Sequence, residues 1–117
     1  SFTFIDDVVE IIVSLIYKPA APDKFFNTDK PNTSSSWCAH RIFNVGSNES
    51  IQIGDFISYL EDELGIKAIK NFCDLQNGDV KNTLSDNAII EQWLGNSPKT
   101  SLKKGINLFI NWYKNYY

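Results

Sequence analysis

A single acid in a tight polar turn is the side chain of this sequence that is best placed for chemistry. Asp79 follows Asn77 and Gly78 within "LQNGDVKNT", residues 75–83. Because Asn-Gly is a frequent turn dipeptide, the carboxylate has two open roles. It can accept hydrogen bonds from a ligand, or it can satisfy only the amide groups of its own turn.

The usual arrangements of catalytic and metal-binding side chains are missing from the sequence. The only histidine, His40, has no nucleophile or acid at a recognised spacing, and Cys38 and Cys73 do not form a CxxC pair. The adjacent acids Asp6 and Asp7 stand at the start of an expected helix, where capping and the helix dipole explain them better than acid–base chemistry does. We therefore predict no catalytic residue and no metal ligand in this chain.

A second turn, formed by Gly46, Ser47 and Asn48, follows an expected strand and precedes an expected helix. In open α/β sheets ligands bind at this place, beyond the carboxyl ends of the strands. The sequence has no GxGxxG pattern, however, and a single glycine also fits an ordinary structural turn. Both interpretations remain open on spacing alone.

Length and composition place the chain among ordinary globular domains. It has 117 residues, of which 43% are hydrophobic, so a real core can form. Its apolar runs are too short for a membrane-spanning helix. A net charge of -3 with scattered basic residues argues against nucleic acids and membranes as partners. Unpaired cysteines fit a reducing compartment, so we expect a cytoplasmic location.

The first part of the chain is expected to hold a short strand, a helix and a long loop. Residues 1–5 alternate as a strand does, and Asp6 or Asp7 can cap the helix that follows, up to Tyr17. This helix is apolar on nearly every side, so partners should enclose it and exclude solvent. Residues 18–40 form a loop. Three aromatic side chains are expected to anchor it in part: Phe25, Phe26 and Trp37.

Three further helices are expected, and glycines end two of them. An apolar stripe over residues 53–64 stops at Gly65, and a short helix capped by Asp86 stops at Gly95. The last helix runs to the end of the chain with an apolar and aromatic stripe. Its cap is one of two residues: Thr100 or Ser101.

Strands at residues 1–5, 41–45 and 67–72 alternate with these helices, which predicts an α/β fold. A parallel sheet needs helices on both faces, and two or three strands cannot cover a helix as apolar as the first. The pattern therefore indicates that further strands lie outside this chain.

Four stretches of the sequence carry a resemblance to a known family: "SFTFIDDVVE", "HRIFNVGSNESIQIGDFISYLEDELGI", "LQNGDVKNTLSDN" and "LGNSPKTSLKKGINLFINWYKNYY". They resemble the carboxy-terminal part of extended short-chain dehydrogenases/reductases that act on nucleotide sugars. The subfamily is that of the UDP-glucuronate 4-epimerases, including capsular-polysaccharide homologues. The similarity covers essentially all 117 residues, in order and at matching spacing.

The resemblance implies an α/β carboxy-terminal fragment with few strands and about four helices, whose Rossmann core is missing. Residues 1–117 would be the substrate-binding portion, with residues 1–17 and 41–46 packed on the absent Rossmann domain. That domain would bind NAD and carry the catalytic residues, so the fragment alone should be inactive. The parent would convert UDP-glucuronate to UDP-galacturonate for surface polysaccharide synthesis and form a homodimer.

The resemblance also implies a nucleotide-binding role for several residues. Asp79 matches an acid that accepts hydrogen bonds from the ribose hydroxyls, and Gln76 stands where galactose epimerases carry a phosphate-binding arginine. Phe2 and Ile51 match positions that line the nucleotide pocket, and Thr83 matches one near the phosphates. The family's arginine before Ser1 is not part of this chain.

Other functions remain open beside this one. A related UDP-N-acetylglucosamine 4-epimerase or a dTDP-sugar dehydratase is the nearest enzymatic alternative. A protein-interaction module that binds a partner through its aromatic last helix is the alternative from another class. With the Rossmann surface absent, we expect exposed apolar area around Val8 to Leu15 and self-association of the chain.

Overall fold

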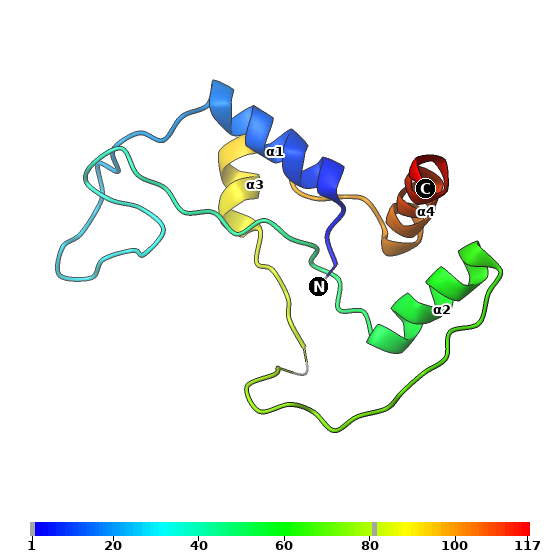
Figure 1. Cartoon of the computed structure of the whole chain (residues 1–117). Coiled ribbons are helices and arrows are strands. Elements are labelled where there is room, and N and C mark those ends of the chain that lie inside the picture. Colours follow the sequence, from blue (N-terminus) through cyan, green and yellow to red (C-terminus); the bar gives the residue numbers. More distant parts are fainter. Residues whose placement is uncertain (1, 81) are drawn as a thin grey trace.

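The computed structural model describes residues 2–80 and 82–117, and its regular elements are four helices joined by long extended segments (Figure 1). They pack as two pairs, α1 with α3 and α2 with α4. The expected helices are thus confirmed, with ends close to the predicted ones. Their bounds are Ile5–Tyr17 for α1, Ile53–Leu64 for α2, Ala88–Leu94 for α3 and Leu102–Tyr116 for α4.

The strands expected at residues 1–5, 41–45 and 67–72 are absent from the described part of the chain, and Ser1 lies outside it. The nearest feature is one antiparallel bridge between Ser35 and Arg41. A strand needs a neighbour to pair its backbone N–H and C=O groups, and beyond this single bridge the described residues provide no strand pairing for these segments. The prediction of an α/β class is therefore not shown directly, because the structure contains helices and unpaired extended segments.

The molecule is less compact than an ordinary domain of its length. Its Cα radius of gyration is 18.5 Å, and it extends over 55 × 36 × 21 Å. A compact chain of this size has a radius of gyration of about 13 Å. In Figure 1 the two helix pairs lie apart, and long connections loop outward from both.

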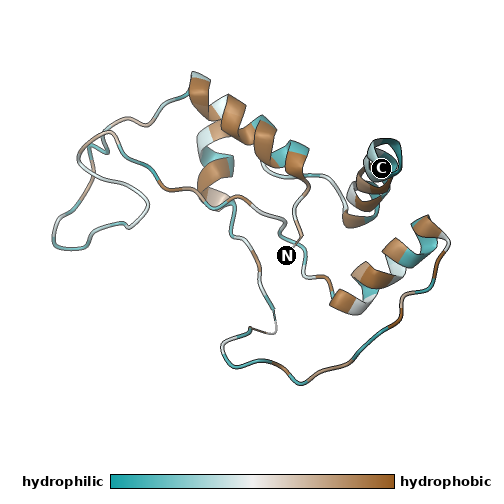
Figure 2. Ribbon diagram, in the orientation of Figure 1, coloured by the Kyte–Doolittle hydropathy of each residue, from teal (hydrophilic) through white to brown (hydrophobic). Residues whose placement is uncertain are grey.

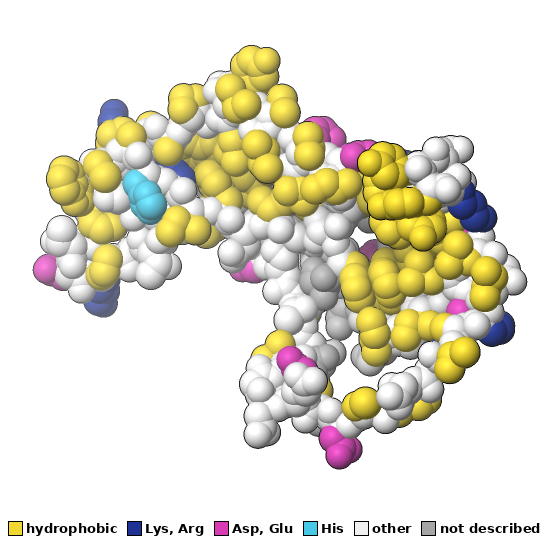
Figure 3. Space-filling view, in the orientation of Figure 1, with side chains coloured by type: hydrophobic (Ala, Val, Ile, Leu, Met, Phe, Trp, Pro, Cys, Tyr) yellow, Lys and Arg dark blue, Asp and Glu magenta, His cyan; other side chains and the backbone are white. Residues whose placement is uncertain are grey.

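Helix α1 exposes most of its apolar surface, so the partners expected to enclose it are not found among the described residues. Ile11, with 1% of its surface exposed, is the buried residue of this helix. In Figure 2 the ribbon of α1 is largely brown, and in Figure 3 yellow side chains cover its outer face. The exposed apolar area expected around Val8 to Leu15 is present. Its members follow helical spacing along one face: Ile5, Val9, Ile12, Val13 and Ile16.

The capping role predicted for Asp6 and Asp7 is wrong. The N-cap of α1 is Phe4, and no side chain caps this end. Asp7 instead reaches across the chain, where its Oδ2 accepts a hydrogen bond from the Thr100 amide and its Oδ1 one from the Thr100 hydroxyl, both at 2.9 Å. The carboxylate thus ties the start of α1 to the segment that leads into α4.

The other predicted helix ends are close to those observed. Gly65 and Gly95 end α2 and α3 with φ of 69° and 72°, the left-handed conformation that favours glycine. Ser101 is the N-cap of α4, as predicted. For α3 the N-cap is Asn87 rather than Asp86, although Asp86 still accepts a hydrogen bond from the Ala88 amide.

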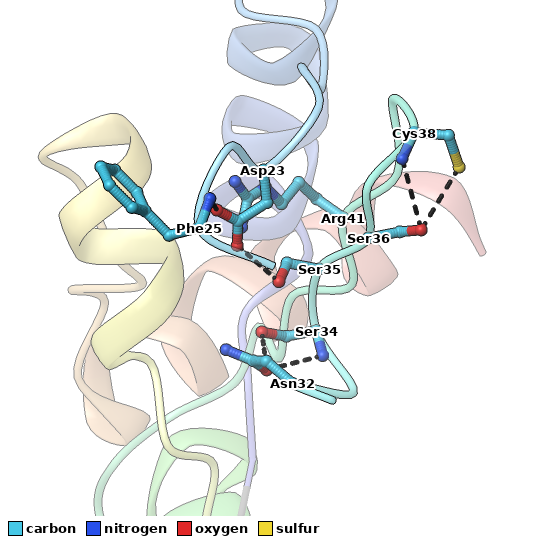
Figure 4. A network of polar contacts seen from close by, with 8 residues as sticks. All are labelled: Asp23, Phe25, Asn32, Ser34, Ser35, Ser36, Cys38 and Arg41. Carbon is cyan, nitrogen blue, oxygen red and sulfur yellow. Dashed lines mark hydrogen bonds and ion pairs between the residues drawn. The ribbon is translucent and has the colours of Figure 1, made fainter. Parts of the chain in front are cut away.

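Polar contacts hold the loop over residues 18–40, and of the three predicted aromatic anchors Phe26 alone is partly buried. Asp23 accepts a hydrogen bond from the Ser35 hydroxyl at 2.8 Å and lies 3.6 Å from the Arg41 guanidinium (Figure 4). The Ser35 bond, the Phe25 amide and the Arg41 charge lower the pKa of Asp23. Arg41 also lies 5.2 Å from the ring of Trp93 on α3. Two of the aromatic side chains expected as anchors, Phe25 and Trp37, are exposed.

A buried carboxylate fastens the segment that leaves α2. Glu61 accepts hydrogen bonds from the Lys67 ammonium at 3.0 Å and from the Ala68 amide at 3.1 Å, and Lys70 lies 3.1 Å away. These partners, Lys67 first, lower the pKa of Glu61 to about 2. Residues 66–70 are therefore held against α2 although they form no strand.

Candidate functional site

The turn around Asp79 leaves its carboxylate unengaged. The Asp79 amide donates to the Gln76 carbonyl at 3.1 Å, and Gly78 has a φ of 97°, as the third residue of a type II turn requires. Among the described residues the carboxylate forms no hydrogen bond and no ion pair. Of the two roles open from the sequence, satisfying the amides of the turn is therefore not the one observed.

A small hollow of about 180 Å³ lies next to this turn. Phe2, Ile51 and Thr83 line it, so the structure brings together three of the five residues predicted to bind the nucleotide. Val80, the neighbour of Asp79, forms another part of the wall. Gln76 lies at the start of the exposed turn. Ligand binding by these five residues stays a prediction.

Two contacts position the wall of this hollow. The ring of Phe2 stacks on that of Phe56 in α2, with centroids 4.2 Å apart and planes at 11°. The Thr3 hydroxyl accepts a hydrogen bond from the Ser47 amide at 2.9 Å. The amino-terminal segment is thus joined to the segment that leads into α2, and residues distant in sequence meet at one place.

The turn at Gly46 is filled by protein groups. Its amide donates to Oδ1 of Asn87 at 3.2 Å, and its carbonyl accepts from Nδ2 of Asn87 at 2.6 Å. Asn87 is buried, and the Ser85 hydroxyl donates to its Oδ1 at 2.9 Å. A Cβ at Gly46 would lie 2.7 Å from the Cβ of Ser85. The structural interpretation of this turn is therefore the one that the geometry favours.

The same geometry tests whether this turn could hold a dinucleotide such as NAD. A dinucleotide turn leaves backbone N–H groups free for the pyrophosphate and uses glycine to let it approach. At Gly46 the amide is bonded to Asn87, and Ser85 occupies the space beside the glycine. The residues of this turn do not fit the cofactor.

A second hollow, of about 300 Å³, lies between the amino-terminal segment, α2 and α4. Its lining has no charged side chain, so it offers no partner for a phosphate. Phe2 belongs to both hollows. The apolar wall of the larger hollow includes Phe2, Phe4, Phe56, Leu60, Ile106 and Phe109.

Sequence reasoning missed three polar residues of the smaller hollow. Ser50, Gln52 and Asn82 line it together with the predicted residues. Gln52 is the N-cap of α2, and its side chain makes no capping bond. Exposed polar residues in extended segments carry no periodic signal, so the sequence alone offered no means of selecting them.

In the described part of the chain, no group of three or more histidine, cysteine, aspartate or glutamate side chains could hold a metal ion. In residues 2–80 and 82–117 no helix is both long and apolar enough to cross a membrane.

Comparison with known proteins gives the family. No protein-family model matches the chain. The protein CapI of Staphylococcus aureus is 36% identical to it over 116 residues, which are 99% of this chain and 35% of CapI. A probable UDP-glucuronate 4-epimerase of Rhizobium meliloti is 32% identical over 117 residues, 99% of this chain and 34% of that protein. This chain belongs to the family of the UDP-glucuronate 4-epimerases.

A plant member of the family shows the same extent of similarity. UDP-glucuronate 4-epimerase 4 of Arabidopsis thaliana is 30% identical over 122 residues, 99% of this chain and 26% of that protein. The chain spans about a third of the length of its bacterial relatives and matches the carboxy-terminal part of these larger epimerases. The family predicted from the sequence is thereby confirmed.

Proposed function

We propose that this chain is the UDP-sugar-binding portion of an NAD-dependent UDP-glucuronate 4-epimerase, which converts UDP-glucuronate to UDP-galacturonate. The observation that carries the proposal is the match of 99% of the chain to proteins named UDP-glucuronate 4-epimerase. The unengaged carboxylate of Asp79 beside a small hollow supports it, because a nucleotide site needs an acceptor for the ribose hydroxyls.

In this proposal each predicted site residue has one task. Asp79 accepts hydrogen bonds from the ribose hydroxyls, and a charged acceptor makes such bonds about twice as strong as neutral ones. Phe2 and Ile51 exclude water from one side of the nucleotide. Gln76 offers an uncharged amide near the pyrophosphate, and Thr83 lies near the phosphates.

The remaining two thirds of the parent would bind the cofactor and carry the reacting groups. NAD, when bound, supplies hydride transfer, and the task of this chain is to hold and orient the nucleotide. The exposed apolar face of α1 supports a parent larger than this chain, since such a face needs a cover. We place that cover, together with the surface against residues 41–46, in the missing part. The parent would act in the cytoplasm, in surface polysaccharide synthesis.

The test uses the complete parent protein. It should interconvert UDP-glucuronate and UDP-galacturonate, and Asp79→Ala should weaken UDP binding about tenfold or more in calorimetric titration. Asp74→Ala is the matched control, because Asp74 is an exposed acid nearby that does not border the hollow. If the parent converts UDP-N-acetylglucosamine and not UDP-glucuronate, the proposed substrate is wrong. If Asp79→Ala and Asp74→Ala bind UDP with equal affinity, the proposed role of Asp79 is wrong.

One observation favours a second candidate, a protein-interaction module. The last turns of α4 and the residue after them expose a ladder of aromatic rings that contact one another, in part stacked and in part tilted. Its members are Phe109, Trp112, Tyr113, Tyr116 and Tyr117. A start codon directly before Ser1 in the coding sequence would support this candidate, whereas an upstream GxxGxxG and YxxxK would support the epimerase.

A further inference from the structure

Asn87 joins two segments of the chain that lie far apart in the sequence. It is buried, with 6% of its surface exposed, and its amide meets both backbone groups of Gly46. The Gly46 amide donates to Oδ1 of Asn87 at 3.2 Å, and Nδ2 of Asn87 donates to the Gly46 carbonyl at 2.6 Å. Oδ1 also accepts a hydrogen bond from the Ser85 hydroxyl at 2.9 Å. The side chain thus fixes the Gly46 turn against the start of α3.

The two segments that Asn87 joins continue into the lining of the smaller hollow. After Gly46 the chain runs into residues 50–53, which line this hollow. Thr83, two positions before Ser85, lines it as well. Asn87 itself does not belong to the lining. It therefore lies outside the hollow and holds together the segments that form its walls.

The amino-terminal segment is tied to the same turn. The Ser47 amide donates to the Thr3 hydroxyl at 2.9 Å. Phe2, the residue before Thr3, lines the smaller hollow and stacks on Phe56 with ring centroids 4.2 Å apart. Three parts of the lining therefore depend on the position of the Gly46 turn.

The packing around Gly46 is close. A Cβ at this position would lie 2.7 Å from the Cβ of Ser85 and 3.5 Å from the hydroxyl oxygen of Thr3. Gly46 is buried, so its N–H and C=O need protein partners, and the Asn87 amide provides them. Without that amide the turn should shift until water can reach these two groups.

We propose that Asn87 is a positioning residue of the nucleotide site, which holds the walls of the smaller hollow at the separation that the nucleotide requires. The inference rests on the proposed function and adds a residue that acts on the ligand through Gly46 and Ser85. A displacement of about 1 Å in a binding site can remove a large part of its effect. Substitutions within such networks change coupling to a ligand by roughly two- to thirtyfold.

The first experiment compares Asn87→Ala with Ile110→Ala in the complete parent protein. Ile110 is the matched control, because it is buried in α4, does not line the smaller hollow and should lose a comparable amount of stability on truncation. Asn87→Ala should weaken UDP binding about five- to thirtyfold in calorimetric titration. Ile110→Ala should change UDP binding less than about twofold.

Steady-state kinetics with UDP-glucuronate separates positioning from stability. The nucleotide is held equally in the substrate complex and in the transition state, so a displaced nucleotide site should raise KM about five- to thirtyfold and leave kcat within about twofold. A residue that only stabilises the fold would lower the apparent kcat, since less of the protein is folded, and leave KM unchanged. That second pattern for Asn87→Ala would overturn the inference.

Ser85→Ala tests the same network with a milder change that keeps the inference testable if Asn87→Ala does not fold. It removes the hydroxyl that donates to Asn87 and should weaken UDP binding about two- to fivefold. Ser14→Ala, which removes a hydroxyl bonded within α1, is its control and should leave UDP binding unchanged. In the Asn87→Ala background Ser85→Ala should have no further effect, because the bond is already lost.

Equal UDP affinity in Asn87→Ala, Ser85→Ala and the unaltered protein overturns the inference. The proposed function still stands in that case if Asp79→Ala weakens UDP binding. If the unaltered parent binds neither UDP nor UDP-glucuronate, the proposed function itself fails, and the inference fails with it.

Discussion

The turns at Gly46 and at Asp79 both raise the expectation of a ligand in the sequence, and the structure separates them. At Gly46 both backbone polar groups are bonded to the buried side chain of Asn87. At Asp79 the backbone closes the turn, and the carboxylate has no partner among the described residues. The difference shows that a glycine turn indicates a ligand only where its polar groups remain uncommitted.

The largest expected effect on stability is at Asn87. Asn87→Ala removes both hydrogen bonds to Gly46 and leaves a buried N–H and C=O without partners, which should cost about 2 to 4 kcal/mol in free energy of unfolding. Urea unfolding followed by tryptophan fluorescence measures it. Asn115→Ala, at an exposed position, should stay within about 0.5 kcal/mol. Equal values for the two variants would mean that the Gly46 turn is not fastened as described.

A somewhat smaller effect is expected at the glycine itself. Gly46→Ala places a Cβ 2.7 Å from that of Ser85, and overpacking of this kind costs about 1 to 3 kcal/mol. Gly54→Ala is the control, because its Cβ meets nothing within 4 Å and alanine favours the helix by up to about 1 kcal/mol. Thermal unfolding should therefore shift in opposite directions, and a shift in the same direction would contradict the assignment.

Unlike Asp79, Glu61 has partners for its carboxylate among the described residues, and these partners should make the folding stability depend on pH. Glu61 has its pKa lowered from 4.5 to about 2, so its charged form stabilises the folded state fully above pH 4.5. That contribution should be lost as the pH falls toward 2. Glu61→Gln should flatten this part of the stability profile in acid unfolding experiments, because it removes the charge that Lys67 and Lys70 contact. A profile for Glu61→Gln equal to that of the unaltered protein would contradict the engagement of this carboxylate.

The smallest effect on stability is expected on the exposed face of α1. Ile11 is buried and Ile12 is 54% exposed, so Ile12→Ser should change the free energy of unfolding by less than about 0.5 kcal/mol. The same substitution should reduce self-association of the isolated chain, because the exposed apolar face drives it. Analytical ultracentrifugation of the unaltered chain and of Ile12→Ser measures this self-association. A monomeric unaltered chain at high concentration would count against an uncovered apolar face.

The helices could be predicted from the sequence because their signals are local. Apolar residues at helical spacing and the stops at Gly65 and Gly95 placed α2 and α3 correctly. The strands were predicted from equally local alternation, but a strand exists only with a neighbour, and in the described part of the chain residues 41–45 have only the single bridge of Arg41 to Ser35.

The candidate site was predictable in part for the same reason. Turn chemistry selected Asp79, and the family resemblance selected Phe2, Ile51 and Thr83, which the structure gathers around one hollow. Gln52 and Asn82 could not be selected, since only the fold brings the N-cap of α2 next to the segment after the turn.

The most direct measurement is a structure of the complete parent protein with UDP bound. The account predicts that the Asp79 carboxylate accepts hydrogen bonds from the ribose hydroxyls within about 3 Å. A nucleotide bound elsewhere, with Asp79 in an ion pair to a protein side chain, would contradict it.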